Sequence, residues 1–77
     1  MSRWRPCKRS EFVRRLHRLG FDGPFSGTRH QFMLYQQQRL TIPSNQEYSI
    51  PQLRQMLKEV QAVLERPITL TEWNDLA

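Results

Sequence analysis

The sequence is poor in cysteine and histidine: its 77 residues include one cysteine, Cys7, and two histidines. A single thiol excludes an intramolecular disulfide, and it excludes a metal site built on several thiolates. We interpret Cys7 as a free thiol near a helix start in a reducing cytosol rather than as a nucleophile. Neither a metal nor another cofactor is expected.

Long apolar runs are also missing. No stretch approaches the roughly 20 apolar residues of a membrane-spanning helix, and no charged segment followed by an apolar one marks a signal peptide. The sequence therefore predicts a cytoplasmic protein without a membrane partner. A chain of 77 residues has room for one small core, so we expect a single domain over residues 1–77.

Acidic residues are scarce, since seven Asp and Glu stand against twelve Lys and Arg, giving a net charge of +5. Glu11 is the only acidic residue in the basic N-terminal run, which comprises Arg3, Arg5, Lys8, Arg9, Arg14, Arg15 and Arg18. This balance favours a polyanionic partner, nucleic acid first and an acidic protein second. An exposed basic helix face without a ligand gives the same pattern, so charge alone does not decide.

The apolar spacing predicts two amphipathic helices and a short helical tail. The first covers residues 8–19 and is followed by Gly20, which suits the left-handed residue after a helix. The second begins after Ser49, which is followed by an early proline, and it carries a regular apolar stripe to residue 64. Pro67 must end it, and the segment 67–77 offers a start signal for a last short helix that carries Trp73.

Strand-forming residues lie between the two helices. Residues 30–36 and 39–43 predict a hairpin, although its turn lacks Asn-Gly or Asp-Gly. Gly23 and Pro24 allow only a short or irregular strand around residues 24–27. The order of helix, three antiparallel strands and helix favours an α+β fold, a two-layer sandwich with a helical tail.

Four short motifs follow one another in a specific order. They are Leu-Gly-Phe at 19–21, Gly-Thr-Arg-His at 27–30, Arg-Leu-Thr-Ile-Pro at 39–43 and Leu-Arg-Gln-Met-Leu at 53–57. Each is weak alone, but the ordered set resembles the HicA (YcfA-like) family of toxins over residues 8–60. Two features depart from the family pattern: Pro24 precedes the second motif, and the tail from Arg66 onward is longer than many members carry.

The resemblance implies a fold similar to the double-stranded-RNA-binding domain. It implies a stress-response toxin of a toxin–antitoxin system, an mRNA interferase that cleaves mRNA without a metal. A HicB-like antitoxin would neutralise it. The family's catalytic histidine stands in the Gly-x-x-His element, and this position is His30 here.

The residues around His30 suit this chemistry. RNA is cleaved when a 2′-hydroxyl attacks the adjacent phosphorus, and an imidazole can carry the proton. Arg29 and Arg39 are candidates for holding the phosphate, and the backbone amides of Gly27 and Thr28 could add anion-binding donors. The second proton-transfer group stays open between Tyr35, water and the substrate. We interpret His17, by contrast, as part of the basic surface of the first helix.

The predicted strand 30–36 is apolar on both faces, with Phe32 and Leu34 on one and Met33 and Tyr35 on the other. A two-layer fold covers only one face, so the exposed pair predicts a docking surface for the antitoxin or for a second copy in a homo-oligomer. The alternative is a distorted strand partly covered by Trp73 and the tail.

Two other functions fit parts of the sequence. A non-catalytic RNA-binding module would share the expected fold, but such modules usually carry a lysine cluster at the start of the second helix. Here that place is taken by Ile-Pro-Gln-Leu at residues 50–53. An adaptor for an acidic protein would use the charge and leave the Gly-x-x-His element unexplained.

Overall fold

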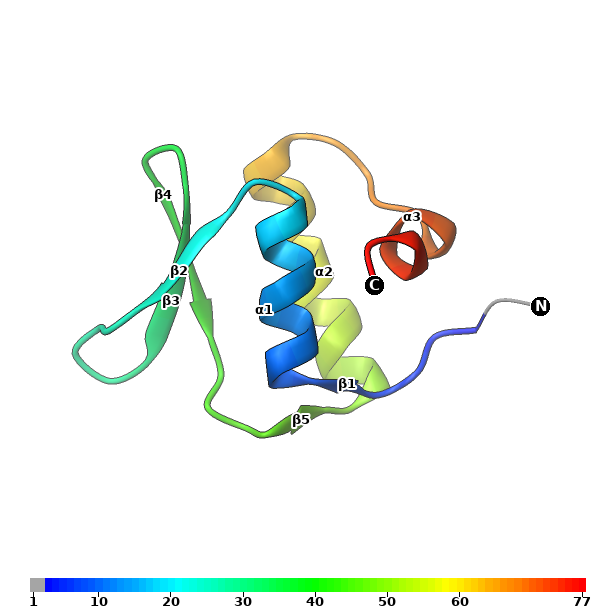
Figure 1. Cartoon of the computed structure of the whole chain (residues 1–77), viewed down its shortest axis with the longest axis horizontal. Coiled ribbons are helices and arrows are strands. Elements are labelled where there is room, and N and C mark those ends of the chain that lie inside the picture. The colour runs from blue at the N-terminus through cyan, green and yellow to red at the C-terminus, as the bar shows by residue number, and fades with distance from the viewer. Residues whose placement is uncertain (1–2) are drawn as a thin grey trace.

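The three-stranded sheet lies at one end of the molecule, and helices α1 and α2 lie between it and the short helix α3 (Figure 1). This arrangement comes from the computed structural model of the chain, which describes residues 3–77. The elements are, in order, β1 (Cys7–Lys8), α1 (Arg9–Arg18), β2 (Asp22–Phe25), β3 (Gln31–Tyr35), β4 (Gln38–Ile42), β5 (Glu47–Tyr48), α2 (Ile50–Leu64) and α3 (Leu70–Asp75). The predicted α+β class and its order of helix, three antiparallel strands, helix and short helix are confirmed.

Helix α1 ends as the sequence predicts. Gly20 has a φ of +103°, which is left-handed, and its amide donates to the carbonyl of His17 at 3.0 Å. The next amide, of Phe21, reaches back to the carbonyl of Leu16 at 2.9 Å. These two hydrogen bonds satisfy carbonyls that would have no partner at the end of the helix, and they direct the chain into β2.

Helices α2 and α3 both start at a capping side chain. The hydroxyl of Ser49 accepts from the amide of Gln52 at 3.3 Å, and that of Thr69 accepts from the amide of Glu72 at 3.1 Å. Each bond satisfies one of the free amides of the first turn. Helix α2 ends at Leu64, before Pro67, so the predicted start and end are both confirmed.

Strands β3 and β4 form the predicted hairpin, with Met33 opposite Leu40 and a two-residue turn. Gln36 takes the left-handed turn position, with a φ of 56°, where glycine or asparagine is usual. Strand β2 is irregular as expected, since its pairing with β3 shifts register between Asp22 and Phe25. It begins earlier than predicted, because Asp22 already pairs with Leu34.

A second, two-stranded pairing was not predicted. The sequence indicated no strand between residue 43 and the second helix, but β5 in this segment pairs antiparallel with β1, with Tyr48 opposite Cys7. Tyr48 is fully buried, and its hydroxyl donates to the carbonyl of Pro43 at 2.6 Å. Segments of two residues carry no period of their own, so only the tertiary fold defines them.

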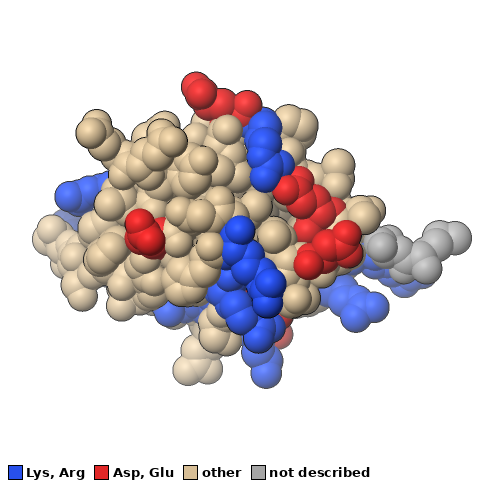
Figure 2. All heavy atoms as spheres, turned by 45° about the horizontal axis from the view of Figure 1, so that its top comes forward, with Lys and Arg blue, Asp and Glu red and all other residues tan. Residues whose placement is uncertain are grey.

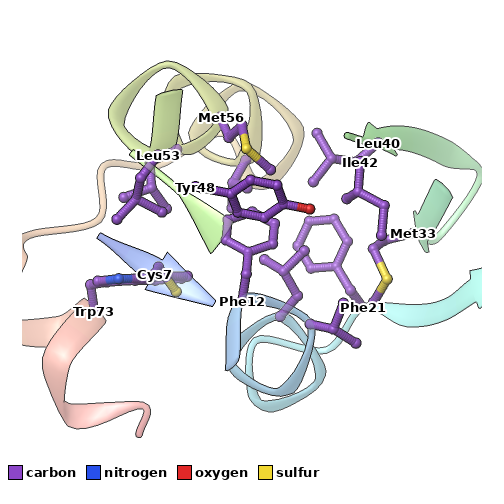
Figure 3. Packing of buried hydrophobic residues seen from close by; sticks show 14 of the residues in the cluster. Cys7, Phe12, Phe21, Met33, Leu40, Ile42, Tyr48, Leu53, Met56 and Trp73 are labelled. Atoms are coloured by element: carbon purple, nitrogen blue, oxygen red, sulfur yellow. The ribbon is translucent and has the colours of Figure 1, made fainter. Parts of the chain in front are cut away.

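The core lies between the helices and the inner face of the sheet (Figure 3). Phe12 of α1 is its centre, with the rings of Tyr48 and Trp73 each at 5.5 Å between centroids. Met33 and Leu40 close it on the sheet side. Because Trp73 packs on α1, the alternative in which Trp73 and the tail partly cover the strand 30–36 is wrong. Within residues 3–77, every helix is too short or too polar to cross a membrane.

Candidate functional site

The loop between β2 and β3 makes a tight turn that only glycine can occupy at position 27. A Cβ on Gly27 would lie 2.3 Å from the carbonyl oxygen of His30, far inside van der Waals contact. The backbone therefore folds back on itself across the Gly-x-x-His element. This close approach explains the spacing of the motif and places His30 directly before the first residue of β3.

The structure brings all of the predicted site residues to one place. They line a surface hollow of about 280 Å³ together with two further residues: Gly27, Thr28, Arg29, His30, Phe32, Arg39 and Thr41. His30 is exposed, as are both arginines, so the imidazole is not sealed in the core. The loop supplies four lining residues, and the hairpin of β3 and β4 supplies the other three.

The hairpin register explains why Phe32 and Arg39 meet. Phe32 pairs with Thr41 and Leu34 pairs with Arg39, so these four side chains share the outer face of the sheet, away from the helices. The guanidinium carbon of Arg39 lies 4.5 Å from the centre of the Phe32 ring. Stacking on the ring orients the guanidinium and leaves its N–H groups, which lie in the plane, able to bind an anion.

Phe25 extends this arrangement across the third strand. Its ring lies 5.6 Å from that of Phe32 and is tilted by 39°, and the side chain is 42% exposed. Phe25 and Thr41 had no role in the sequence prediction of the site. The alternation of β4 could have indicated Thr41, but the position of Phe25 depends on the irregular register of β2.

The charge of the hollow has one sign. No Asp or Glu is among its lining residues in the described part of the chain, and Arg29 and Arg39 both contribute to it. Asp22 is the only acidic residue of β2, β3 and β4, and it pairs with Leu34, toward the other end of β3. The hollow therefore favours an anionic ligand.

In the basic N-terminal run, in contrast, some of the arginines form ion pairs and hydrogen bonds within the protein. Arg14 and Arg15 both form ion pairs with Glu11, and the hydrogen bond from Arg14 lowers the pKa of the Glu11 carboxyl. Arg15 also donates to the carbonyl of Trp73 at 3.1 Å. Figure 2 shows a stripe of Lys and Arg over the middle of the molecule with acidic groups close beside it, whereas the sheet end on this face is mainly uncharged.

The second histidine also has a structural role. His17 is exposed on α1, but its Nε2 lies 2.6 Å from the carbonyl oxygen of Gly23, to which it donates a hydrogen bond. This bond ties α1 to β2. His17 therefore does more than extend the basic surface, which is all that the sequence suggested.

Two other candidate groups lie away from the hollow. Tyr35 is on the inner face of the sheet, with its ring 5.1 Å from that of Phe21, so it cannot serve as the proton donor beside His30. Cys7 is buried, and burial raises the pKa of its thiol, which fits the interpretation as an unreactive free thiol. Within residues 3–77, no three His, Cys, Asp or Glu side chains are grouped so as to hold a metal ion.

No protein-family model, curated protein or solved structure matches this chain. The resemblance to the HicA family rests on the four sequence motifs.

Proposed function

We propose that this chain is an RNA-cutting toxin of the HicA type, a metal-independent endoribonuclease that cleaves mRNA in the cytoplasm with His30 as its catalytic residue. One observation supports this above all others: an exposed imidazole, two guanidinium groups and a tight glycine turn line the same hollow. The proposal includes a likeness to the double-stranded-RNA-binding domain and a HicB-like antitoxin as partner.

In the proposed reaction, His30 takes the proton of a ribose 2′-hydroxyl. The 2′-oxygen then bonds to the adjacent phosphorus, the bond from phosphorus to the 5′-oxygen breaks, and a 2′,3′-cyclic phosphate remains. Proton transfer by a positioned histidine accelerates such a step by roughly 10²- to 10⁴-fold. Arg29 and Arg39 would stabilise the negative charge that grows on the phosphate oxygens.

The leaving 5′-oxygen needs a proton. Tyr35 lies on the other face of the sheet, and the hydroxyls of Thr28 and Thr41 are too weakly acidic to supply one. The proton therefore comes from water or from His30 itself, which has just accepted one. In the second case one histidine carries the proton in both directions, first as base and then as acid.

An antitoxin that neutralises this site would cover the hollow. Its contacting surface would be acidic, because it must satisfy Arg29 and Arg39 once water is removed from them.

A non-catalytic RNA-binding module is the competing function. Helix α2 begins at Ile50 and Pro51 without a lysine cluster, and Arg54 on its outer side stacks on Trp4, with the guanidinium carbon 5.8 Å from the ring centre. The helix start that would enter an RNA groove in such modules is therefore uncharged here.

The test is to express the wild type and His30→Ala at matched protein levels, and to assay the purified proteins on RNA in EDTA. We expect growth arrest and RNA cleavage from the wild type, and a loss of cleavage of about 10²-fold or more in His30→Ala. His17→Ala is the matched control, since it removes the other histidine and should still cut RNA. RNA binding with no cleavage by the wild type would favour the binding module.

A further inference from the structure

The outer face of the sheet carries a row of side chains that crosses all three strands. We call Phe25 of β2, Phe32 of β3 and Arg39 of β4 the aromatic row. Phe32 is in the middle, with the Phe25 ring at 5.6 Å and the Arg39 guanidinium carbon at 4.5 Å from its ring centre. Figure 1 shows α1, α2 and α3 all on one side of this sheet, so no helix of residues 3–77 covers the row.

The aromatic row is not an extension of the core. Phe25 is the one large apolar side chain that the described structure leaves exposed, whereas the sheet's residues in the core come from the opposite face of β3 and β4. An exposed phenyl ring gains little stability from its position. Together with the half-buried Phe32 it forms an apolar patch beside the hollow, and such patches commonly mark binding surfaces.

The chemistry of the row matches an unpaired nucleotide. Phenyl rings and guanidinium planes are the groups on which proteins stack RNA bases, and they accept any base because every base has a flat π-face. The arginines of the hollow supply partners for the adjoining phosphates, and no carboxylate lines it in the described chain. An acidic protein partner would use the same arginines but would not need the aromatic pair.

We infer that the aromatic row is a stacking site for an unpaired base of single-stranded RNA, and that it sets the neighbouring sugar and phosphate beside His30. The inference rests on the proposed function, and it defines the substrate as single-stranded. In a duplex the bases are already stacked inside the helix, so neither Phe25 nor Arg39 could reach a base face.

The experiment measures binding separately from cleavage. The full chain carrying His30→Ala is titrated onto three fluorescent oligomers of equal length: single-stranded RNA of mixed sequence, the same RNA annealed to its complement, and an abasic strand. We expect the single strand to bind at least about tenfold more tightly than the abasic strand, because base stacking contributes to its affinity.

Two pairs of variants then locate the site. Phe25→Leu removes the aromatic ring and should weaken single-strand binding about tenfold, while Phe25→Tyr keeps a stacking ring and should bind within about twofold of the parent. Arg39→Gln should weaken binding about tenfold, while Lys58→Gln removes the same charge from the exposed side of α2 and should change it by less than about twofold. Circular dichroism is used to check that each variant is folded.

The inference is overturned if Phe25→Leu binds the single strand as tightly as the parent, or if the duplex binds as tightly as the single strand. It is also overturned if Phe25→Leu abolishes self-association in sedimentation without changing RNA affinity, because the face would then be a protein interface. The two proposals fail separately. A wild type that binds RNA through Phe25 and cuts none refutes the nuclease alone, whereas equal cleavage by wild type and Phe25→Leu refutes the stacking site alone.

Discussion

Three arginines of the described chain lie over aromatic rings, and two of them, Arg15 and Arg39, are in opposite situations. Arg15 lies over Trp73, with its guanidinium carbon 5.0 Å from the ring centre, and it also donates to the Trp73 carbonyl and pairs with Glu11. Arg39 lies over Phe32 at 4.5 Å and faces the hollow that contains His30. The same pairing therefore holds the fold together at Arg15, whose terminal nitrogens have partners inside the protein, whereas the donors of Arg39 face solvent at the proposed site.

The largest expected effect is on stability, and it distinguishes the buried ring of Trp73 from the exposed ring of Phe25. Trp73→Ala removes a buried ring that packs on Phe12 and should lower the free energy of unfolding by roughly 3–5 kcal/mol, enough to unfold much of a small domain. Phe25→Leu, on the exposed ring, should lower it by less than about 1 kcal/mol. Urea unfolding measures both, and equal losses would show that Phe25 also belongs to the folding core.

Substitutions at two glycines test the site and the fold separately. Gly27→Ala places a methyl group against the His30 carbonyl, so the loop must shift, and cleavage should fall about 10²-fold because the imidazole is displaced. Gly20→Ala is the matched control, since its left-handed φ costs about 1–2 kcal/mol of stability. That variant should cut RNA normally. Normal cleavage by Gly27→Ala would show that the turn does not position His30.

Substitution of Arg39 and of Arg15 tests the comparison directly. Arg39→Gln should lower kcat/KM for RNA cleavage about tenfold with little change in stability, because a phosphate contact is lost. Arg15→Gln should leave cleavage unchanged and lower the free energy of unfolding by about 1–2 kcal/mol, because the hydrogen bond to the Trp73 carbonyl and the ion pair with Glu11 are both lost. The comparison is wrong if both variants lose cleavage activity to the same extent, or if both lose stability to the same extent.

The smallest expected effect concerns the ion pair beside Arg15. The hydrogen bond from Arg14 holds the pKa of Glu11 below its usual range in the folded state. Its contribution is therefore present above the unfolded-state pKa and is lost as the pH falls through the folded-state pKa. Glu11→Gln should cost less than about 1 kcal/mol at pH 7, since the pair is near the surface. Unfolding in urea at pH 7 and in acid checks this: the difference from wild type should vanish in acid.

Much of this fold could be predicted because its signals are local. Helix spacing, the serine cap of α2 and the glycine after α1 each depend on neighbours within one or two turns, so the two main helices and the hairpin were expected where they occur. The Gly-x-x-His element also marked the loop of the candidate site. The sequence by itself thus determined the order of elements and the place of His30 at the start of a predicted strand.

Only the tertiary structure decided which segments of the chain lie next to each other. The pairing of β1 with β5, the packing of Trp73 on Phe12, and the row formed by Phe25, Phe32 and Arg39 all join segments that are distant in the sequence. No local pattern encodes such contacts, because they depend on strand register and on which apolar surfaces meet when the chain collapses. Arginine and aromatic residues therefore contribute to a packed interior on one side of the molecule and to the open face of the proposed site on the other.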